Sequence, residues 1–453
     1  MRNHDKKNPS SATRNALAMG SVLLLLSIHA AQADEQDLAE RVRVLEEALT
    51  SVKAEEQAAQ ARNSANANNL VSAQERGGRM LFASADGDFT FHIGGRLQLD
   101  TAWYDADITP MGSGTKFRRA RLEASGTMYQ DWSYVFRYEF TENGENGIKD
   151  AYLGYHGFKP VDKQLSLYLG NQFQAFGFQG QQTPKYTLFM EQPTSSLLLG
   201  AGQRRLGARS DLIGSNWRWS FGAAQAALGT RASEDNRNDP VDLATQFIFN
   251  PIQERGHVLS VGASLRHHSA NGSNVHRQRT RPQTHISSFR PVDTGTFNSD
   301  GFIGAGIQAV YQRGPFELES EYFQQKYDRI QGGIADGEKP EFNGGYVQAG
   351  YFLTGESRAY NPGRSVFGPP TPARRLSQGG PGAWQLAAGY STVDLTDGSI
   401  DGGKIDMLML GINWYPEQRL RLTLEYGNAL KVDGGPSNGD EPSFVQARAQ
   451  IEW

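Results

Sequence analysis

The sequence predicts an all-β protein, a sixteen-stranded antiparallel transmembrane β-barrel with an N-terminal periplasmic coiled-coil helix. Three observations predict this class: an export signal at the N-terminus, a change from a helical to a two-residue period after residue 88, and the composition. The chain has 51 glycines and 10% aromatic residues, yet its mean hydropathy is −0.55. A helical membrane protein cannot be that polar, whereas a barrel can, because one side of each strand faces water.

Residues 1–33 have the pattern of a signal peptide. Basic residues precede an apolar run from Ala16 to Ile28, and Ala31-Gln32-Ala33 supplies a small-x-small cleavage site, so the mature chain should begin near Asp34. A membrane anchor is the alternative, but the run is too short to span a bilayer comfortably. The chain has no Cys, which excludes disulfides, thiolate metal sites and thiol nucleophiles. We expect export to the bacterial outer membrane.

Residues 34–62 predict a periplasmic helix, because they are rich in alanine and charge and contain neither Pro nor Gly. Apolar residues recur at alternating spacings of four and three, the a/d rhythm of a coiled coil, at Leu38, Val42, Leu45, Leu49 and Val52. In that register Arg41 and Glu46 have the spacing of an interchain ion pair. The alternative is a single amphipathic helix. Residues 63–88 are expected to be a linker, polar and rich in Asn, Ala and Ser at its start.

From residue 89 to 453 the period is two, and apolar side chains alternate with polar ones. We expect strands at 89–104, 115–128, 132–141, 148–156, 164–171, 203–211, 216–229, 241–250, 257–266, 301–313, 315–328, 342–354, 383–394, 403–415, 419–430 and 443–453. A soluble sandwich would also alternate. Aromatic residues at strand ends, and a final strand that ends on Trp453 in the outward phase, favour the membrane barrel.

Connections after even-numbered strands are short and the others are generally longer, as in a porin with periplasmic turns and external loops. One connection breaks the rule. Thr354 to Gly382 is long and rich in Pro and Gly, yet by parity it belongs on the periplasmic side.

Sixteen strands predict an aqueous lumen rather than a packed core. The charges of the inward phase are mixed, with arginines at 96, 119, 121, 137, 421 and 448 and acids at 100, 123, 139, 317, 319, 321, 425 and 452. The wall is therefore expected to give no net sign of charge, and selectivity is expected to come from loops.

Two stretches contain no Asp or Glu, Gly256 to Val292 and Ser357 to Val393. The first holds five arginines and five of the nine histidines, and the second holds four arginines. The planar guanidinium binds oxyanions bidentately and stays charged, so these stretches predict an anion filter. The alternative is a pair of external loops facing lipopolysaccharide. No carboxylate or Cys lies near the histidines in sequence to complete a metal site, so we expect surface histidines and no metal.

The connection from Asn171 to Gly202 is too apolar for an exposed external loop, because it carries four phenylalanines and few charges. We expect it to fold into the lumen as a constriction. Lys185 would then be a cation at the narrowest point, unless it only pairs with Glu191.

Several stretches resemble the phosphate-selective porin O and P family, and they run over essentially the whole barrel. They are Phe117 to Leu122 (FRRARL), Asp131 to Tyr134 (DWSY), Thr183 to Gln192 (TPKYTLFMEQ), Arg279 to Pro282 (RTRP), Phe289 to Gly295 (FRPVDTG), Leu353 to Tyr360 (LTGESRAY), Gly382 to Leu386 (GAWQL) and Gly411 to Tyr415 (GINWY). The resemblance implies a sixteen-stranded trimeric barrel with an inward third loop and an arginine-lined path.

Carried over position by position, the family's loop arginines fall on Arg279, Arg281 and Arg290, and its inner-loop lysine falls on Lys185. Secondary candidates in the matching stretches are Arg119, Arg121 and Arg358. The chain departs from the family's pattern at Gln192, Gln385 and Gly389. The missing arginine at 389 makes anion preference a firmer expectation than phosphate selectivity.

The expected function is an outer-membrane porin for passive, anion-preferring diffusion of small solutes, with phosphate or polyphosphate among them. An organic-anion (carboxylate) porin and a structural tether of the outer membrane are the alternatives. No HExxH, GxSxG or P-loop motif is present, so we expect neither an enzyme nor a cofactor. Expected partners are small anions, outer-membrane lipid and lipopolysaccharide, and two further copies in a homotrimer. Nucleic acid is not an expected partner.

Overall fold

The computed structural model describes the chain in two compact units, residues 1–70 and 71–453. The described residues are 35–67, 71–75, 79–200, 204–229, 238–272, 274–333 and 335–453. The expected signal peptide therefore lies outside the described residues. In the described chain, no helix combines the length and apolar character needed to cross a membrane.

The first unit contains helix α2 (Glu35–Ala67), which extends past the expected end at residue 62. Its side chains over residues 37–61 are exposed, including all five apolar residues of the a/d seam. Ion pairs one turn apart support the helix, with Arg41 and Asp37 3.0 Å apart and Arg43 and Glu40 2.8 Å apart. Propensity and local charge pairs therefore form the helix, and its apolar seam is exposed.

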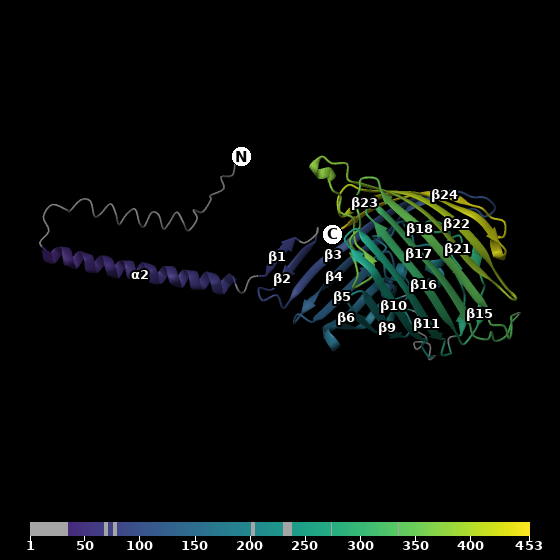
Figure 1. Cartoon of the computed structure of the whole chain (residues 1–453), viewed down its shortest axis with the longest axis horizontal. Coiled ribbons are helices and arrows are strands. Elements are labelled where there is room, and N and C mark those ends of the chain that lie inside the picture. The colour runs from purple at the N-terminus through teal and green to yellow at the C-terminus, as the bar shows by residue number, and fades with distance from the viewer. Residues whose placement is uncertain are drawn as a thin grey trace. The chain divides into compact units, whose positions relative to one another are not determined.

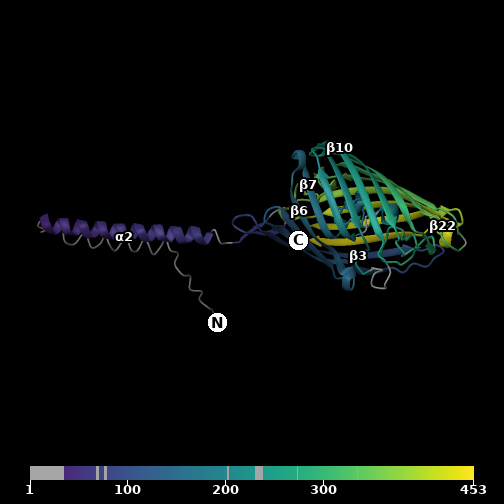
Figure 2. The same cartoon turned by 90° about the horizontal axis from the view of Figure 1, so that it is seen from below.

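The second unit is the expected barrel (Figure 1; Figure 2). Among the described residues, sixteen antiparallel strands close the cylinder. They are β3 (Thr90–Asp105), β4 (Gly114–Met128), β5 (Trp132–Glu139), β6 (Ile148–Phe158), β7 (Gln164–Phe173), β8 (Arg204–Ile213), β9 (Trp217–Ala224), β10 (Val241–Glu254), β11 (His257–Ser269), β16 (Gly301–Arg313), β17 (Phe316–Tyr327), β18 (Glu341–Phe352), β21 (Ala383–Asp397), β22 (Ile400–Tyr415), β23 (Leu420–Asp433) and β24 (Ser443–Glu452). The pairing of β24 with β3 closes the ring.

Strand periodicity produces the two faces of the wall. On β3, Phe91, Ile93 and Leu97 are exposed on the outside, whereas Arg96 and Gln98 are buried inside. The chain end completes this strand pair. Gly95 donates to the Trp453 carbonyl at 3.1 Å, and a methyl group on Gly95 would lie 2.4 Å from the Trp453 ring. The ring of the terminal tryptophan therefore packs directly against a glycine of β3.

The segment expected as a linker, 63–88, holds the end of α2 and a hairpin. Strand β1 (Ser72–Glu75) pairs with β2 (Met80–Ala83), and β2 pairs with Thr90 to His92 of β3. These strands are only four residues long, and sequence periodicity detects such short strands poorly. They extend the sheet beyond the end of β24.

The sixteen strand positions match the sequence expectation closely, and β16 has the expected bounds. Strand parity places the connection between β18 and β21 at the end of the barrel that carries the short turns. This connection, residues 353–382, is named the long turn. It contains the short pair β19 (Tyr360–Asn361) and β20 (Val366–Phe367).

The long turn and two loops enter the barrel. The inner loop, residues 174–203, joins β7 to β8, and the basic loop, residues 270–300, joins β11 to β16. The basic loop contains the strand pairs β12 (Val275–His276) with β15 (Phe297–Asn298), and β13 (Arg279–Thr280) with β14 (Val292–Asp293). Phe189 of the inner loop, Val292 of the basic loop and Phe367 of the long turn are all buried. The expected inward fold of the inner loop is therefore confirmed.

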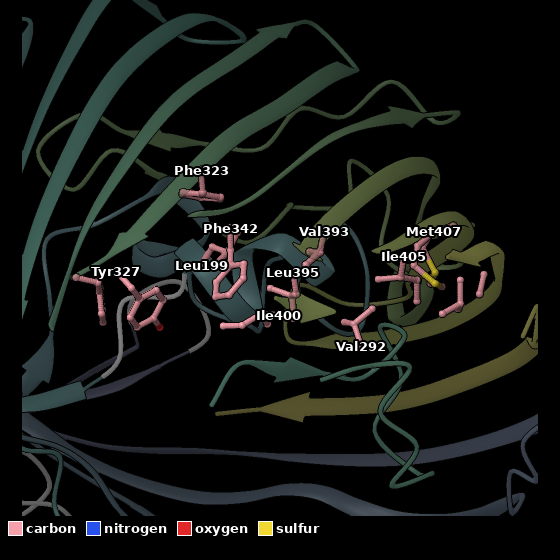
Figure 3. Close-up of a cluster of buried hydrophobic side chains, with 14 of the residues drawn as sticks. Leu199, Val292, Phe323, Tyr327, Phe342, Val393, Leu395, Ile400, Ile405 and Met407 are labelled. Carbon is pink, nitrogen blue, oxygen red and sulfur yellow. The ribbon is translucent and has the colours of Figure 1, made fainter. Parts of the chain in front are cut away.

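A hydrophobic cluster fills part of the interior (Figure 3). It joins Leu199 of the inner loop and Val292 of the basic loop to inward side chains of strands β17 to β22, among them Phe323, Phe342 and Ile405. Each such side chain stabilises the fold by about 1.5–3 kcal/mol relative to exposure. The interior is therefore a packed core along part of the wall.

Candidate functional site

Glycines of the wall leave space that side chains of the inner loop occupy. A methyl group on Gly389 of β21 would lie 2.8 Å from the Phe189 ring, and one on Gly411 of β22 would lie 3.3 Å from it. A methyl group on Gly350 of β18 would lie 2.6 Å from Leu188. The glycine at 389, where the family resemblance implies an arginine, is thus the space that Phe189 occupies.

Buried carboxylates of the same strands anchor the inner loop by accepting hydrogen bonds from it. The N-terminus of helix α3 (Phe178–Gln181) is bound by Glu321 of β17. The Glu321 carboxylate accepts hydrogen bonds from the Phe178 and Gln179 amides, the latter at 3.0 Å. Glu425 accepts from the Met190 amide at 2.6 Å. These acids therefore hold the loop and do not face the lumen. We call this side, β16–β18 and β21–β24, the packed wall.

Arg358 belongs to the same buried network. Its Nε lies 2.7 Å from Glu317 and its Nη2 lies 2.8 Å from Glu319, while Nη1 donates to the Tyr186 carbonyl of the inner loop. The side chain is 2% exposed. The structure therefore places this secondary candidate in the anchor between the long turn and the inner loop, away from the lumen water.

Lys185 and Glu191 of the inner loop do not pair with one another. Lys185 Nζ lies 2.5 Å from Glu452, whereas Glu191 receives both Nε and Nη2 of Arg118 at 3.0 Å and Nη2 of Arg448 at 2.7 Å. Burial lowers the pKa of Lys185 to about 8, although the Glu452 carboxylate opposes this shift. The alternative that Lys185 only pairs with Glu191 is therefore wrong.

The opposite side of the barrel, β4–β8, has a different interior. Several side chains that point inward there keep partial exposure, whereas most of their counterparts on the packed wall are buried. The partly exposed ones include Glu123, Arg137, Tyr152, Tyr168 and Arg209. Water therefore reaches the lumen along β4–β8, which we call the open wall.

In the arginine ion pairs of the open wall, the cation is the more exposed partner. Arg204 is 20% exposed while Asp150, 3.0 Å away, is 3% exposed, and Arg137, which also pairs with Asp150, is 28% exposed. The same order holds for Arg121 with Glu139 and for Arg209 with Asp211. The carboxylates of these pairs are thus less exposed than the guanidinium groups in front of them.

The basic loop brings further cations to this path. Arg281 lies near Arg118, and Lys116 Nζ donates to the His285 carbonyl at 2.6 Å. Burial, together with the charges of Arg118, Arg281 and Lys116, lowers the pKa of His285 to about 3. This imidazole is therefore neutral at physiological pH.

Arg279 and Arg290 lie close to Arg281, so the structure brings three of the four primary candidates together. Burial and the charges of Arg281 and Arg279 lower the pKa of Arg290. Lys185 is in the inner loop and is not part of this cluster. Within the described residues, no group of three or more His, Asp or Glu side chains could hold a metal ion.

The sequence did not single out Arg118, and a β-bulge explains why. The pairing of β3 with β4 shifts between Gln98 and Leu99, so Arg119 lies opposite Gln98 while Phe117 lies opposite Leu99. Arg118 is the extra residue, and its side chain joins that of Arg119 on the inside at Glu191. Strict alternation would point Arg118 outward. Arg119 itself is buried and donates to Gln98 at 2.8 Å.

Residues 91–453 match the model of the family described as phosphate-selective porin O and P. Porin O of Pseudomonas aeruginosa is 25% identical over 402 residues, which cover 80% of this chain and 88% of that one. An uncharacterized protein of Caulobacter vibrioides is 27% identical over 384 residues, covering 81% and 75%. An anion-selective porin from Comamonas acidovorans superposes with a TM-score of 0.51 at 14% identity, covering 81% and 100%, which shows a common fold.

Proposed function

This chain belongs to the phosphate-selective porin O and P family and is therefore an outer-membrane porin; we propose that it gives small anions passive diffusion in preference to cations. Phosphate and polyphosphate are the proposed physiological solutes. The family match and the relationship to Porin O support this finer assignment.

The observation that carries anion preference is the recessed position of the carboxylates on the open wall. At Arg204 and Asp150, the guanidinium meets water and the acid does not. Coulomb energy falls with distance, so an anion in the lumen is attracted more by the near guanidinium than it is repelled by the acid behind it. A confined lumen weakens screening by bulk salt, whose Debye length is about 8 Å at physiological ionic strength. A wall with nearly balanced charge can thus present a cationic surface.

The proposed path begins at the cluster of Arg279, Arg281 and Arg290 and continues to Arg118. It then follows the open wall past Arg121, with Lys185 facing it from the inner loop. Arg118, Arg121 and Arg290 already have a carboxylate or carbonyl partner, which limits how tightly any one of them can hold a solute. Several moderate sites in series allow conduction, whereas a single tight site would trap the ion.

The deciding measurement is the reversal potential of purified channels in a planar bilayer under a KCl gradient. Anion preference predicts a potential shifted toward the chloride equilibrium potential, and a shift toward that of potassium would reject the proposal. Phosphate is tested separately by titrating it into the chloride solution. Phosphate preference requires half-block at a lower concentration than that needed by sulfate or acetate.

We also propose that the chain forms a homotrimer and that α2 associates with copies of itself as a coiled coil. The exposed seam from Leu38 to Val52 is short, so isolated helices would associate weakly. Attachment to an oligomeric barrel raises the local concentration of the helices and favours their pairing.

The absence of native Cys makes this proposal directly testable. Leu45→Cys, at a seam position, should form interchain disulfides under mild oxidation. Glu47→Cys, on the opposite side of the helix, is the matched control and should form far fewer. Equal crosslinking at the two positions would reject the coiled coil, whereas barrel trimers would be measured independently by native electrophoresis.

A further inference from the structure

Two tyrosines lie side by side on the inner face of the open wall. Tyr152 of β6 and Tyr168 of β7 have ring centroids 5.8 Å apart at an interplanar angle of 87°, and His156 of β6 lies 5.6 Å from Tyr168. The Tyr168 ring covers Gly154, where a methyl group would lie 3.1 Å from it. The rings are therefore held against the wall by its backbone.

Arginines lie around this pair of rings, and Asp211 also interacts electrostatically with Tyr168. The Arg209 guanidinium lies 5.1 Å from the Tyr168 centroid, and Tyr152 interacts electrostatically with both Arg209 and Arg137. From the long turn, the exposed Arg364 interacts electrostatically with Tyr168 and His156. Aromatic surface and positive charge therefore meet at one place on the anion path.

The aromatic residues of the packed wall show what distinguishes this pair. Tyr327 and Phe342 are fully buried and pack on other aromatic rings in the hydrophobic cluster. Tyr152 and Tyr168 keep partial exposure to the lumen. Core packing explains the first pair, but it does not account for rings left accessible among arginines.

We propose that this cluster is a binding site for organic anions that carry an aromatic ring, such as benzoate. The guanidinium groups attract the carboxylate, and the tyrosine rings offer edge-to-face or offset contact to the ligand ring. Chloride and phosphate gain nothing from such rings. The inference rests on the proposed anion path and adds a class of solute to it.

The test compares benzoate with cyclohexanecarboxylate, which has the same charge and nearly the same size but no aromatic ring. Each is titrated into KCl while single-channel current is recorded. Benzoate is expected to half-block at a concentration about two- to tenfold lower, the range that an aromatic pair adds beyond area burial. Tyr152→Leu with Tyr168→Leu should remove this difference, whereas Tyr152→Phe with Tyr168→Phe should retain it.

Tyr155→Leu is the matched control, because Tyr155 lies on the outer face of the same strand, against Trp132 and Phe158. This variant should keep the benzoate difference. Equal block by the two acids in the wild-type channel would overturn the inference, as would loss of the difference in the Tyr155 variant. Because the reversal potential is measured on the same channels, failure of anion preference itself would be recognised separately.

Discussion

The packed wall and the open wall have the same alternating pattern and similarly mixed charges, but their carboxylates have different partners. On the packed wall, Glu321 and Glu425 accept hydrogen bonds from the backbone of the inner loop. On the open wall, Asp150 and Asp211 accept from arginine side chains that meet the lumen. Acids thus anchor a loop on one side and orient cations on the other. Charge counts along a strand cannot distinguish these roles.

The comparison predicts that removal of an arginine from the packed wall mainly affects stability. Arg358→Gln leaves Glu317 and Glu319 buried without their guanidinium, which should lower the free energy of unfolding by about 3–5 kcal/mol. Urea unfolding of the detergent-folded barrel measures this loss. Arg374→Gln, an exposed position of the same long turn, is the control and should change stability little. Equal stability of the two variants would contradict the anchor.

A smaller loss of stability is expected when a larger side chain replaces a glycine that contacts the inner loop. Gly389→Val would collide with the Phe189 ring and should cost about 1–3 kcal/mol, the usual range for overpacking. The displaced inner loop should also change the single-channel conductance. Gly112→Ala is the matched control, because a methyl group there meets no atom within 4 Å. An unchanged conductance and stability in the Gly389 variant would show that the position of Phe189 does not depend on the space at Gly389.

On the open wall, loss of an arginine should instead change selectivity. Arg137→Gln removes a guanidinium that faces water and leaves Glu123 without its 2.6 Å partner. The ratio of chloride to potassium permeability should fall about two- to fivefold, as expected for roughly 1 kcal/mol between charges in water-filled space. Reversal potentials in a KCl gradient provide the measurement.

Removal of a carboxylate from an open-wall ion pair should have the opposite effect. Asp211→Asn leaves Arg209 charged but removes the carboxylate 2.6 Å away, so anion preference should rise. If both substitutions moved the reversal potential in the same direction, the recessed carboxylates would not be the source of selectivity.

The smallest effect is expected from the titration of Lys185. Its lowered pKa of about 8 means that the ammonium is largely charged at pH 7 and largely neutral at pH 9. Anion preference should therefore decrease as the pH rises through this window, by less than in the Arg137 variant, since Glu452 already neutralises part of the charge. Lys185→Arg, which stays charged, should show no such decrease between pH 7 and 9. A decrease of the same size in that variant would assign the titration to another group.

The sequence by itself determined the strands and their two faces. The expected strand 301–313 is found at Gly301–Arg313, and the inward phase of Arg137 and Arg421 follows from alternation alone. The reason is that the two-residue period is a local property of extended backbone, so it can be read from neighbouring residues.

Only the tertiary structure decided which inward charges reach water. Arg421 and Arg137 are both expected in the inward phase, yet Arg421 is buried and donates to the Thr187 and Leu188 carbonyls of the inner loop, whereas Arg137 lines the lumen. The inward turn of Arg118 depends on a bulge in the pairing with β3, and the partner of Lys185 is a residue of the last strand. These outcomes depend on contacts between segments far apart in the chain, because exposure of a charge is set by whatever fills the space in front of it.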